Sequence, residues 1–496
     1  MTSFPTAHHT PRAHADVPVP GLHGHPLAGV YHSILEMVGN TPLLELTRLD
    51  AGKCRLFVKM ENLNPANSIK DRIGIAMIEA AEREGKINPK GTPGPTIIEA
   101  TAGNTGLGLA LATTQKGYRL IVVVPDKMSQ EKVQHLRAMG AEVRMARSDV
   151  TKGHPDYFHE VARKLAADTP NAVFMNQFAN EANAKAHEDK TGPEIWNQLE
   201  GKVDAVVVGV GSGGTLSGCG RFFKRMNPAI EMVLCDPVGS VLAPLVNEKK
   251  QVPPGAWLVE GMGEDYVPEI CDLALVHEAI AVTDEQSFFA ARELLHKEGV
   301  LAGSSAGCLI HGALAYCRRQ AAPKNVVTFI CDTGAKYLSK MFNDYWMMDQ
   351  GFIKRERTGD LRDLIARRHQ FREDYTAEPG TPVQQAFKMM GLYDVSQLAV
   401  LEHPRRVGDK ARVVGIIDES DILLALQHDK QAFQKPVEAF MTRRLETLPP
   451  GAPIADLTPI FRADRVAIVA EPDGTYHGLI TRVDLIHYLK AQLARA

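Results

Sequence analysis

Cysteine is scarce in this sequence and forms no recognisable pattern. The 496 residues include 7 cysteines, an odd number, and no two of them are spaced as Cys-x-x-Cys. Such usage argues against a disulfide framework and a zinc ribbon, and it favours a reducing compartment. We therefore expect a cytoplasmic protein without a metal site.

An excess of charge of one sign is missing, and so are long hydrophobic runs. The formal net charge of −3 gives no electrostatic reason to expect a nucleic acid or a membrane as partner. No apolar run approaches the ~20 residues that a membrane span needs, and the N-terminus lacks the basic-then-apolar pattern of a signal peptide. With 44% hydrophobic residues, the composition is typical of an ordinary soluble globular protein.

The length of the chain exceeds what one core supports, so two or three domains are expected. The first 30 residues are rich in Pro, His and Gly and predict a disordered tail. Mixed charge with little aromatic content near residue 360 predicts a solvated interdomain helix rather than a nucleic-acid patch. The expected division is a tail (1–30), a main domain (31–350), a linker (351–375) and two C-terminal repeats (about 376–435 and 436–496).

Short Val/Ile-rich strands alternate with amphipathic helices in the main domain. This alternation predicts an α/β fold in which parallel strands are covered by helices on both faces. Active sites in such folds lie beyond the carboxyl ends of the strands. The expected strands are 55–59, 96–98, 120–124, 142–144, 172–176, 205–208 and 231–235.

Lys70 lies where a loop turns into a helix predicted over residues 73–84. Asn67 or Ser68 is the expected N-cap, which puts Lys70 in the first turn. An ammonium is unfavourable at that end of the helix dipole, whereas a lysine bound covalently to an aldehyde avoids much of the cost. The alternative is a surface lysine in a Lys-Asp-Arg charge cluster, and the hexapeptide 67–72 alone favours it.

Two later loops suit anions. The loop at residues 101–106 starts a helix with small residues and exposed amides, which suits a carboxylate. The glycine loop at residues 209–215 can hold a phosphate with its backbone N–H groups. Its G-x-G-x-x-G spacing, with Asp236 ending the next strand, equally fits a dinucleotide site when it is taken alone. A hydride-transfer enzyme needs neither Lys70 nor the 101–106 loop, so the combination favours the phosphate interpretation.

These motifs, with Ala302-Gly303-Ser304-Ser305-Ala306-Gly307, resemble the β-family (fold type II) of pyridoxal-phosphate enzymes. The resemblance covers about residues 31–350 and implies that Lys70 holds pyridoxal 5′-phosphate as its Schiff-base residue. It implies further cofactor contacts from Asn104, Gly211, Ser212, Gly213, Gly214, Thr215 and Ser305. It implies substrate contacts from Thr101, Ala102, Gly103, Asn104, Thr105, Gln177, Glu260 and Gly261.

The chemistry of the family follows from the neutral hydroxyl of Ser305. A carboxylate facing the pyridine nitrogen would favour transamination, whereas a hydroxyl favours loss of a β-substituent. In isolation, Ser305 also fits a plain Ser/Gly turn, and Gln177 fits a loop amide that bonds to nearby backbone.

Within this family, the Glu260-Gly261 loop and the segment 339–346 resemble cystathionine β-synthases, whereas Phe178 is more typical of cysteine synthases. The resemblance implies β-replacement on serine by homocysteine, giving cystathionine. The alternative is O-acetylserine with sulfide, giving cysteine. A remote third interpretation is a non-catalytic adenosyl-ligand sensor, which the joint retention of Lys70, Asn104, Gly213 and Ser305 disfavours.

Some animal cystathionine β-synthases carry an N-terminal haem segment with a Cys–His ligand pair. No cysteine precedes Cys54 here, so we expect no haem, despite the histidines of the tail. We also expect a homo-oligomer, a dimer or a larger assembly.

The C-terminal region contains an internal repeat in which residues 414–423 match residues 477–486. Two such strand–turn–helix units must pack together to bury their apolar faces. The pattern resembles paired cystathionine-β-synthase-type regulatory repeats (a Bateman module). The resemblance implies that Thr481 and Asp484 bind the ribose of S-adenosylmethionine or an adenine nucleotide, and Asp418 in the first copy predicts a single site. The alternative is that Thr481 and Asp484 only cap a helix.

Overall fold

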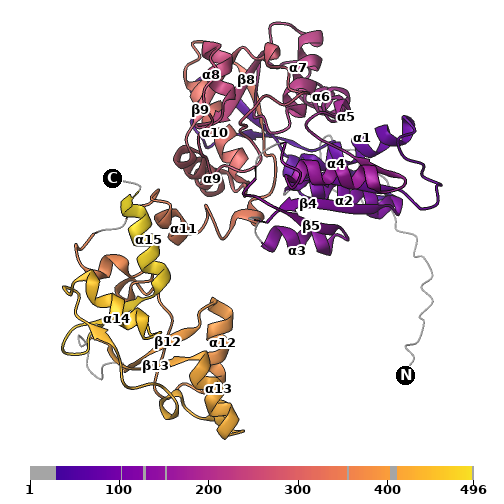
Figure 1. Cartoon of the computed structure of the whole chain (residues 1–496). Coiled ribbons are helices and arrows are strands. Elements are labelled where there is room, and N and C mark those ends of the chain that lie inside the picture. Colours follow the sequence, from indigo (N-terminus) through magenta and orange to yellow (C-terminus); the bar gives the residue numbers. More distant parts are fainter. Residues whose placement is uncertain are drawn as a thin grey trace, which may run out of the picture. The chain divides into compact units, whose positions relative to one another are not determined.

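The computed structural model describes residues 30–101, 103–126, 130–150, 153–354, 357–402 and 410–493. The expected tail therefore lies outside the described residues apart from Val30, and so does Ala102. The chain divides into two compact units, Met1–Tyr337 and Leu338–Ala496 (Figure 1). In the described ranges, no helix combines the length and the apolar character that a membrane crossing requires.

The larger sheet of the first unit has six strands in the order β1-β2-β10-β7-β8-β9. Only β1 runs antiparallel to its neighbour; the remaining pairs are parallel. The central strands are buried over their whole length, which accounts for their continuous Val/Ile/Leu character. The bounds are β1 Leu43–Leu46, β2 Arg55–Lys59, β7 Ala205–Val208, β8 Glu231–Pro237, β9 Glu278–Val282 and β10 Asn325–Phe329.

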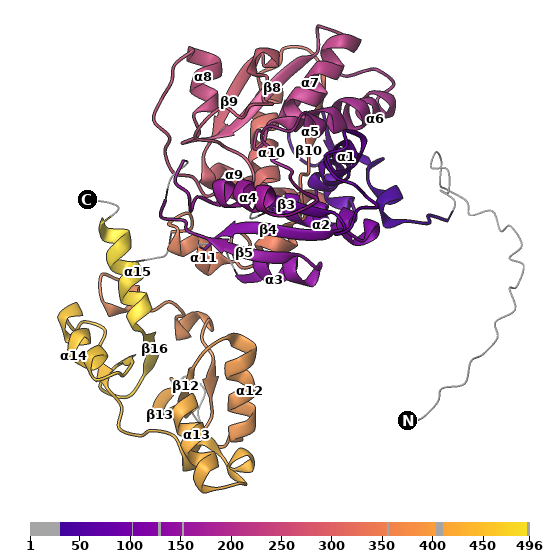
Figure 2. The same ribbon diagram turned by 45° about the vertical axis from the view of Figure 1, so that its right-hand side comes forward.

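The smaller sheet has four parallel strands in the order β5-β4-β3-β6 (Figure 2). Alternate residues of its strands join different cores. Ile97 and Val122 pack with apolar residues of α1 and α2, whereas Ile98 and Val123 pack with α4. Helices therefore cover both faces, as predicted. The bounds are β3 Thr96–Ala100, β4 Arg119–Pro125, β5 Glu142–Ala146 and β6 Ala172–Phe174.

All seven strands expected from the sequence are present, and they are shared between these two sheets. The helix α10 packs on β8, β9 and β10 of the larger sheet. The helices of the first unit are α1 Lys70–Arg83, α2 Asn104–Lys116, α3 Gln130–Ala138, α4 Phe158–Asp168, α5 Glu181–Ala186, α6 Gly192–Gln198, α7 Gly214–Met226, α8 Leu242–Glu248, α9 Asp284–Glu298 and α10 Ser304–Arg318.

Helices α1 and α2 touch through their backbones. A Cβ atom at Gly74 would lie 2.4 Å from the carbonyl carbon of Gly108, and a Cβ atom at Gly108 would lie 2.4 Å from the Lys70 carbonyl oxygen. Only glycine permits such an approach. The crossing holds the first residue of α1 against the first two turns of α2.

The predicted N-cap of α1 is wrong. The helix begins at Lys70, and its N-cap is Ile69, which makes no side-chain cap hydrogen bond. Asn67 is left-handed with φ +63, and Ser68 forms a β-bridge with Asp332, so both residues precede the helix and do not cap it. The Ser68 hydroxyl still accepts a hydrogen bond from the Lys70 N–H at 3.2 Å.

The residues after Lys70 form no surface charge cluster. Asp71 and Arg72 are buried, and the Arg72 guanidinium donates to the carboxylates of Glu61 and Glu194. Lys59 completes this interior network through an ion pair of 2.8 Å with Glu194. The charges are therefore structural, and the alternative interpretation of the hexapeptide is wrong for these residues.

The second unit repeats one pattern of elements. In each copy a short strand pairs parallel with a second strand, which pairs antiparallel with a third. Ala399 and Leu401 of the first copy share a core with Ile468 and Ala470 of the second, as the repeat predicts. The bounds are β11 Thr376–Ala377, α12 Val383–Tyr393, β12 Gln397–Glu402, β13 Arg412–Asp418, α13 Glu419–His428, β14 Thr447–Leu448, α14 Leu457–Arg462, β15 Ala467–Ala470, β16 Tyr476–Ile480 and α15 Arg482–Leu493, preceded by α11 Asp344–Asp349.

The expected solvated helix in the linker is wrong. Over the described residues 357–375 the chain forms only two short 3-10 turns, Leu361–Leu364 and His369–Phe371. Leu361, Leu364 and Ile365 are buried in the core of the second repeat. Charged residues are abundant in this segment, but these three apolar residues attach it to the core.

Candidate active site

Lys70 reaches toward the glycine loop of the larger sheet. Its amine lies 3.5 Å from the Ser212 hydroxyl. The side chain is half-buried, and burial lowers the pKa of the Lys70 ammonium, although Cys331, Glu264 and Glu99 oppose the shift. A lysine that loses its proton more readily than usual is suited to act as a nucleophile and as a base.

The glycine loop joins β7 to α7 and leaves room for a ligand at the start of the helix. Gly213 is the N-cap, has φ +88 and makes no side-chain cap hydrogen bond, so the first N–H groups of this 13-residue helix have no side-chain cap. A Cβ atom at Gly211 would lie 2.6 Å from the Gly261 carbonyl oxygen. Free N–H groups in a loop that excludes side chains fit a phosphate.

The rival dinucleotide interpretation loses its ribose partner. Asp236 is fully buried, and its carboxylate accepts a hydrogen bond of 2.9 Å from the Ala243 N–H at the start of α8. The hydrogen bond gives this carboxylate a structural contact inside the fold. The geometry therefore favours the phosphate interpretation of the glycine loop.

The loop before α2 faces two further segments. The Asn104 amide nitrogen donates to Asp332 at 2.9 Å, and the Thr105 hydroxyl donates to the Gln177 side chain at 2.7 Å. The Thr101 hydroxyl accepts the Gly103 N–H at 3.2 Å and shapes the turn. Gln177 thus lies against this loop, as the resemblance implied, while Ala102 is outside the described residues.

Ser305 is the second residue of α10 and is buried. Its hydroxyl bonds to the Cys331 thiol, and burial raises the pKa of that thiol to about 12. The Cys331 carbonyl accepts the Ile69 N–H at 2.9 Å. Ser305 therefore lies opposite the residue before Lys70.

The Glu260-Gly261 loop lies against the glycine loop. The Gly263 N–H donates to the Val210 carbonyl at 2.8 Å, and the Glu260 N–H donates to the Ser304 hydroxyl at 2.9 Å. The Glu260 carboxylate forms an ion pair with Lys132 of α3. This pair links the loop to a helix of the smaller sheet.

Phe178 lies between two other aromatic side chains. Its ring centroid is 6.2 Å from that of Tyr266 and 5.5 Å from that of His159. Tyr266 follows the Glu260-Gly261 loop, so Phe178 forms part of the wall beside that loop.

Sequence reasoning missed several residues at this site. Asn183 donates to the Ser212 hydroxyl at 2.9 Å, and His187 contacts the Thr215 hydroxyl at 3.3 Å. Burial lowers the pKa of His187 to about 3, which keeps its ring neutral. Nothing in their spacing distinguishes them. Asp332, by contrast, follows the carboxyl end of β10, and the rule for such ends could have found it.

Asp332, Lys336 and Lys132 are the other residues that were missed. Lys336 donates to the Asn104 side-chain oxygen at 2.6 Å. Each of the three residues contacts a residue that is distant in the sequence.

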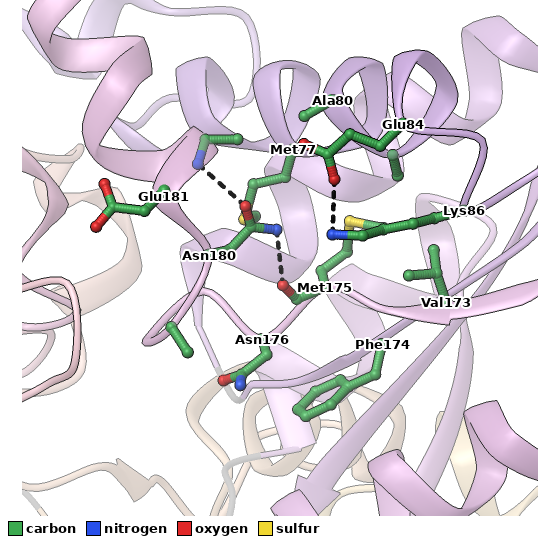
Figure 3. A pocket seen from close by; sticks show the side chains of 13 residues that line it. Met77, Ala80, Glu84, Lys86, Val173, Phe174, Met175, Asn176, Asn180 and Glu181 are labelled. Carbon is green, nitrogen blue, oxygen red and sulfur yellow. Dashed lines mark hydrogen bonds and ion pairs between the residues drawn. The ribbon is translucent and has the colours of Figure 1, made fainter.

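A separate pocket of about 380 Å³ lies along α1 away from Lys70 (Figure 3). Met77 and Ala80 line one side, and Phe174 and Asn176 line the other. None of the predicted site residues lines it, so it is distinct from the site around Lys70.

Comparison with known proteins agrees with this geometry. The chain matches the family of pyridoxal-phosphate dependent enzymes over residues 34–332, and CBS domains over residues 365–428 and 437–491. The chain therefore belongs to the pyridoxal-phosphate-dependent enzymes.

Among its relatives, the chain is 33% identical to cystathionine beta-synthase of Dictyostelium discoideum over 93% of this chain and 92% of that protein. It is 40% identical to cystathionine beta-synthase of Apis mellifera, over 65% of this chain and 63% of that protein. It is 38% identical to the O-acetylserine dependent cystathionine beta-synthase of Bacillus subtilis, over 63% of this chain and 97% of that protein. Within its class, the chain belongs to the cystathionine β-synthase family.

We predict that Glu99 makes the stability of the protein depend on pH. Its carboxylate is fully buried, and burial raises its pKa to about 8, although backbone N–H groups of Gln177, Asn176 and Ala100 oppose the shift. The folded protein then holds a proton that the unfolded chain releases above about pH 4.5, so the free energy of unfolding falls as pH rises toward about 8.

Glu99→Gln cannot ionise, and we expect it to be more stable than the parent at about pH 8, by at least ~1 kcal/mol, with a smaller difference at about pH 5. Thermal unfolding at both pH values measures this. The exposed Glu84→Gln is the control. Equal pH slopes for the parent and Glu99→Gln would contradict the prediction.

Proposed function

We propose that this enzyme replaces the β-hydroxyl of serine with the thiol sulfur of homocysteine and so forms cystathionine. The observation that carries the proposal is the position of the Lys70 amine, which lies at the phosphate-type glycine loop while its helix crosses the start of α2. The membership of the cystathionine β-synthase family supports it.

The residues present fit pyridoxal phosphate. The loop of Gly211, Ser212 and Gly213 would hold the phosphate, and the Lys70 amine would bind the aldehyde carbon. Ser305 would face the pyridine nitrogen with a neutral hydroxyl. When bound, the cofactor supplies the electron sink that makes the Cα hydrogen of the amino acid acidic.

The carboxylate of serine would be held by the loop at residues 101–105. The exposed N–H groups at the start of α2 suit an anion, and Gln177, fixed by Thr105, supplies a further polar group. Held there, the substrate would present its Cα hydrogen toward Lys70. Once the amino group of the substrate has displaced the Lys70 amine from the aldehyde carbon, this amine would take the proton as a base and later return one as an acid. The burial that lowers the pKa of Lys70 favours the basic form.

The leaving group determines which donor the site serves. Hydroxide leaves poorly and must be protonated, whereas acetate leaves readily. The Bacillus relative is named for dependence on O-acetylserine, which makes that donor the second candidate. We favour serine because the relative that matches over most of this chain is named without that restriction.

The first prediction is that Lys70 is the covalent anchor of the cofactor. The purified protein should be yellow, and borohydride reduction followed by peptide mass spectrometry should place the cofactor on Lys70. The turnover number of Lys70→Ala should be lower than that of the parent by a factor of at least ~10², because proton transfer alone contributes that factor. Lys202→Ala, at an exposed lysine outside the site, is the control and should keep its turnover. A cofactor found on Lys336 or any other lysine would refute the assignment.

The second prediction concerns the substrates. A panel that crosses serine and O-acetylserine with homocysteine and sulfide should give the highest kcat/KM for serine with homocysteine. Lys70→Ala sets the background rate. A much higher kcat/KM for O-acetylserine with sulfide would identify a cysteine synthase, and cofactor binding without turnover of any pair would favour a sensor.

We further propose that the second unit binds an adenosyl compound, S-adenosylmethionine or an adenine nucleotide, through Thr481 and Asp484. In the structure these residues cap α15 with each other: the Thr481 hydroxyl and N–H both donate to the Asp484 carboxylate at 2.6 Å. Asp418 and Asp421 form the equivalent capping box at the start of α13. The second copy has the hydroxyl of Thr481 where the first copy has Asp418, and we take this hydroxyl as the group that bonds to a ribose.

The third prediction uses this equivalence as its control. In calorimetric titration of the full-length enzyme, one of S-adenosylmethionine, ATP and AMP should bind at one site per chain. Asp484→Ala should abolish the binding, whereas Asp421→Ala, which loses the matching cap, should retain it. Binding of none of the three compounds, or equal loss in both variants, would leave only the capping role.

A homo-oligomer and a cytoplasmic location stay predictions. All seven cysteines are free.

A further inference from the structure

The segment 331–336 is hydrogen-bonded to two motifs of the active site at once. On one side, the Ile69 N–H donates to the Cys331 carbonyl at 2.9 Å, next to Lys70. On the other side, the Gly303 N–H donates to the Asp332 carbonyl at 3.1 Å, next to Ser305. The segment therefore connects the lysine motif to the serine motif.

The Asp332 side chain extends this connection to Asn104. One carboxylate oxygen accepts hydrogen bonds from the Asn104 amide at 2.9 Å and from the Tyr337 hydroxyl at 3.0 Å. A Cβ atom at position 303 would lie 1.9 Å from the other oxygen, so Gly303 leaves the space that the carboxylate fills. Asp332 is almost completely buried. A buried carboxylate in a space made by a glycine has a fixed position.

Asn104 is held between two groups of opposite charge. Lys336 donates to its side-chain oxygen at 2.6 Å, while Asp332 accepts from its nitrogen. An ammonium only donates and a carboxylate only accepts, so the amide cannot exchange its two ends without losing both bonds. Asp332 uses one of the two N–H groups of the amide, and the second remains for a ligand.

Asn104 belongs to the helix that crosses the Lys70 motif. Asn104 is one helical turn before Gly108, where α2 touches the Lys70 carbonyl. The start of α2 therefore lies beside the start of α1, from which the Lys70 side chain extends. The ring of pyridoxal phosphate carries a phenolic oxygen next to the aldehyde that a lysine binds, and this oxygen accepts hydrogen bonds.

We propose that Asp332 and Lys336 are positioning residues that hold the Asn104 side chain as a hydrogen-bond donor toward the phenolic oxygen of bound pyridoxal phosphate. The proposal rests on the assignment of Lys70 and Asn104 to the cofactor. Asn104, Lys336 and Tyr337 all stabilise the charged form of Asp332 against the burial that raises its pKa. Bonded to Lys336 through its oxygen and to Asp332 through its nitrogen, the amide keeps its second N–H for the cofactor.

The test is the absorption spectrum and cofactor affinity of purified variants. A donor to the phenolic oxygen stabilises its ionised form, which absorbs at long wavelength. Asn104→Ala should therefore shift absorbance from the yellow band to the near-ultraviolet band and weaken cofactor binding at least ~10-fold, the value of a hydrogen bond to a charged group. Asp332→Asn and Lys336→Met should shift both quantities in the same direction by a smaller factor.

Asp236→Asn is the matched control, because Asp236 is also a buried carboxylate but binds the Ala243 N–H. It should change thermal stability and leave the spectrum unchanged. The double variant of Asn104→Ala with Asp332→Asn should match Asn104→Ala alone in spectrum and affinity, because a positioning residue has no effect once its target is gone.

The outcomes separate the two assignments. An unchanged spectrum in Asn104→Ala would overturn the role of Asn104 itself. A shift in Asn104→Ala with none in either Asp332→Asn or Lys336→Met would overturn the positioning role and leave the role of Asn104 intact. If Asp332→Asn fails to fold, Lys336→Met decides, since its side chain is partly exposed and removes the opposite contact.

Discussion

The backbone contact between α1 and α2 is the constraint on which the active site depends. Lys70 belongs to a segment tied to the larger sheet, whereas Asn104 extends from the smaller sheet. Gly74 and Gly108 let the helices that follow these residues cross without intervening side chains. A single methyl group at either position would separate the two backbones, and with them the lysine from the loop that would hold the substrate carboxylate.

The interior near this crossing holds many charges, and they are compensated to different degrees. Arg72 lies between Glu61 and Glu194, and Lys59 bonds to the same Glu194, so that each buried charge has a partner of opposite sign. Removing one member of such a network leaves an uncompensated buried charge. This destabilises the fold by more than the intact network stabilises it. Glu99 belongs to no such network, and burial raises its pKa to about 8. The network thus fixes the scaffold, while Glu99 would make this part of the fold sensitive to pH.

Local signals in the sequence predicted much of the architecture. Strands β2 and β7 have the predicted bounds, because runs such as Val206-Val207-Val208 fit little other than a buried strand. The strand–loop–helix order around Gly213 was also predictable. The start of α1 was not, because Ser68 pairs with Asp332, more than 250 residues away in the chain.

The residues that complete the site depend on such distant pairings. Asp332 and Lys336 occur in a stretch without repeated spacing, and only the folded chain brings them to Asn104. The structure of the linker was predicted wrongly for a different reason. Its charged residues outnumber Leu361, Leu364 and Ile365, yet the burial of these three residues determines its structure. Composition describes the average of a segment, whereas a fold depends on the few side chains that it buries.

In the second unit, the start of α15 is already satisfied before any ligand arrives. Because Thr481 and Asp484 bond to each other, a ligand gains only the difference between the bonds that it makes and the cap that it breaks. A vicinal diol can replace both partners at once and lose nothing, whereas a sugar with one hydroxyl leaves one of these half-buried groups unpaired. A helix start capped in this way would therefore bind a ribose in preference to a deoxyribose. The difference in binding free energy between the two sugars would be larger than the net binding free energy that the ribose gains.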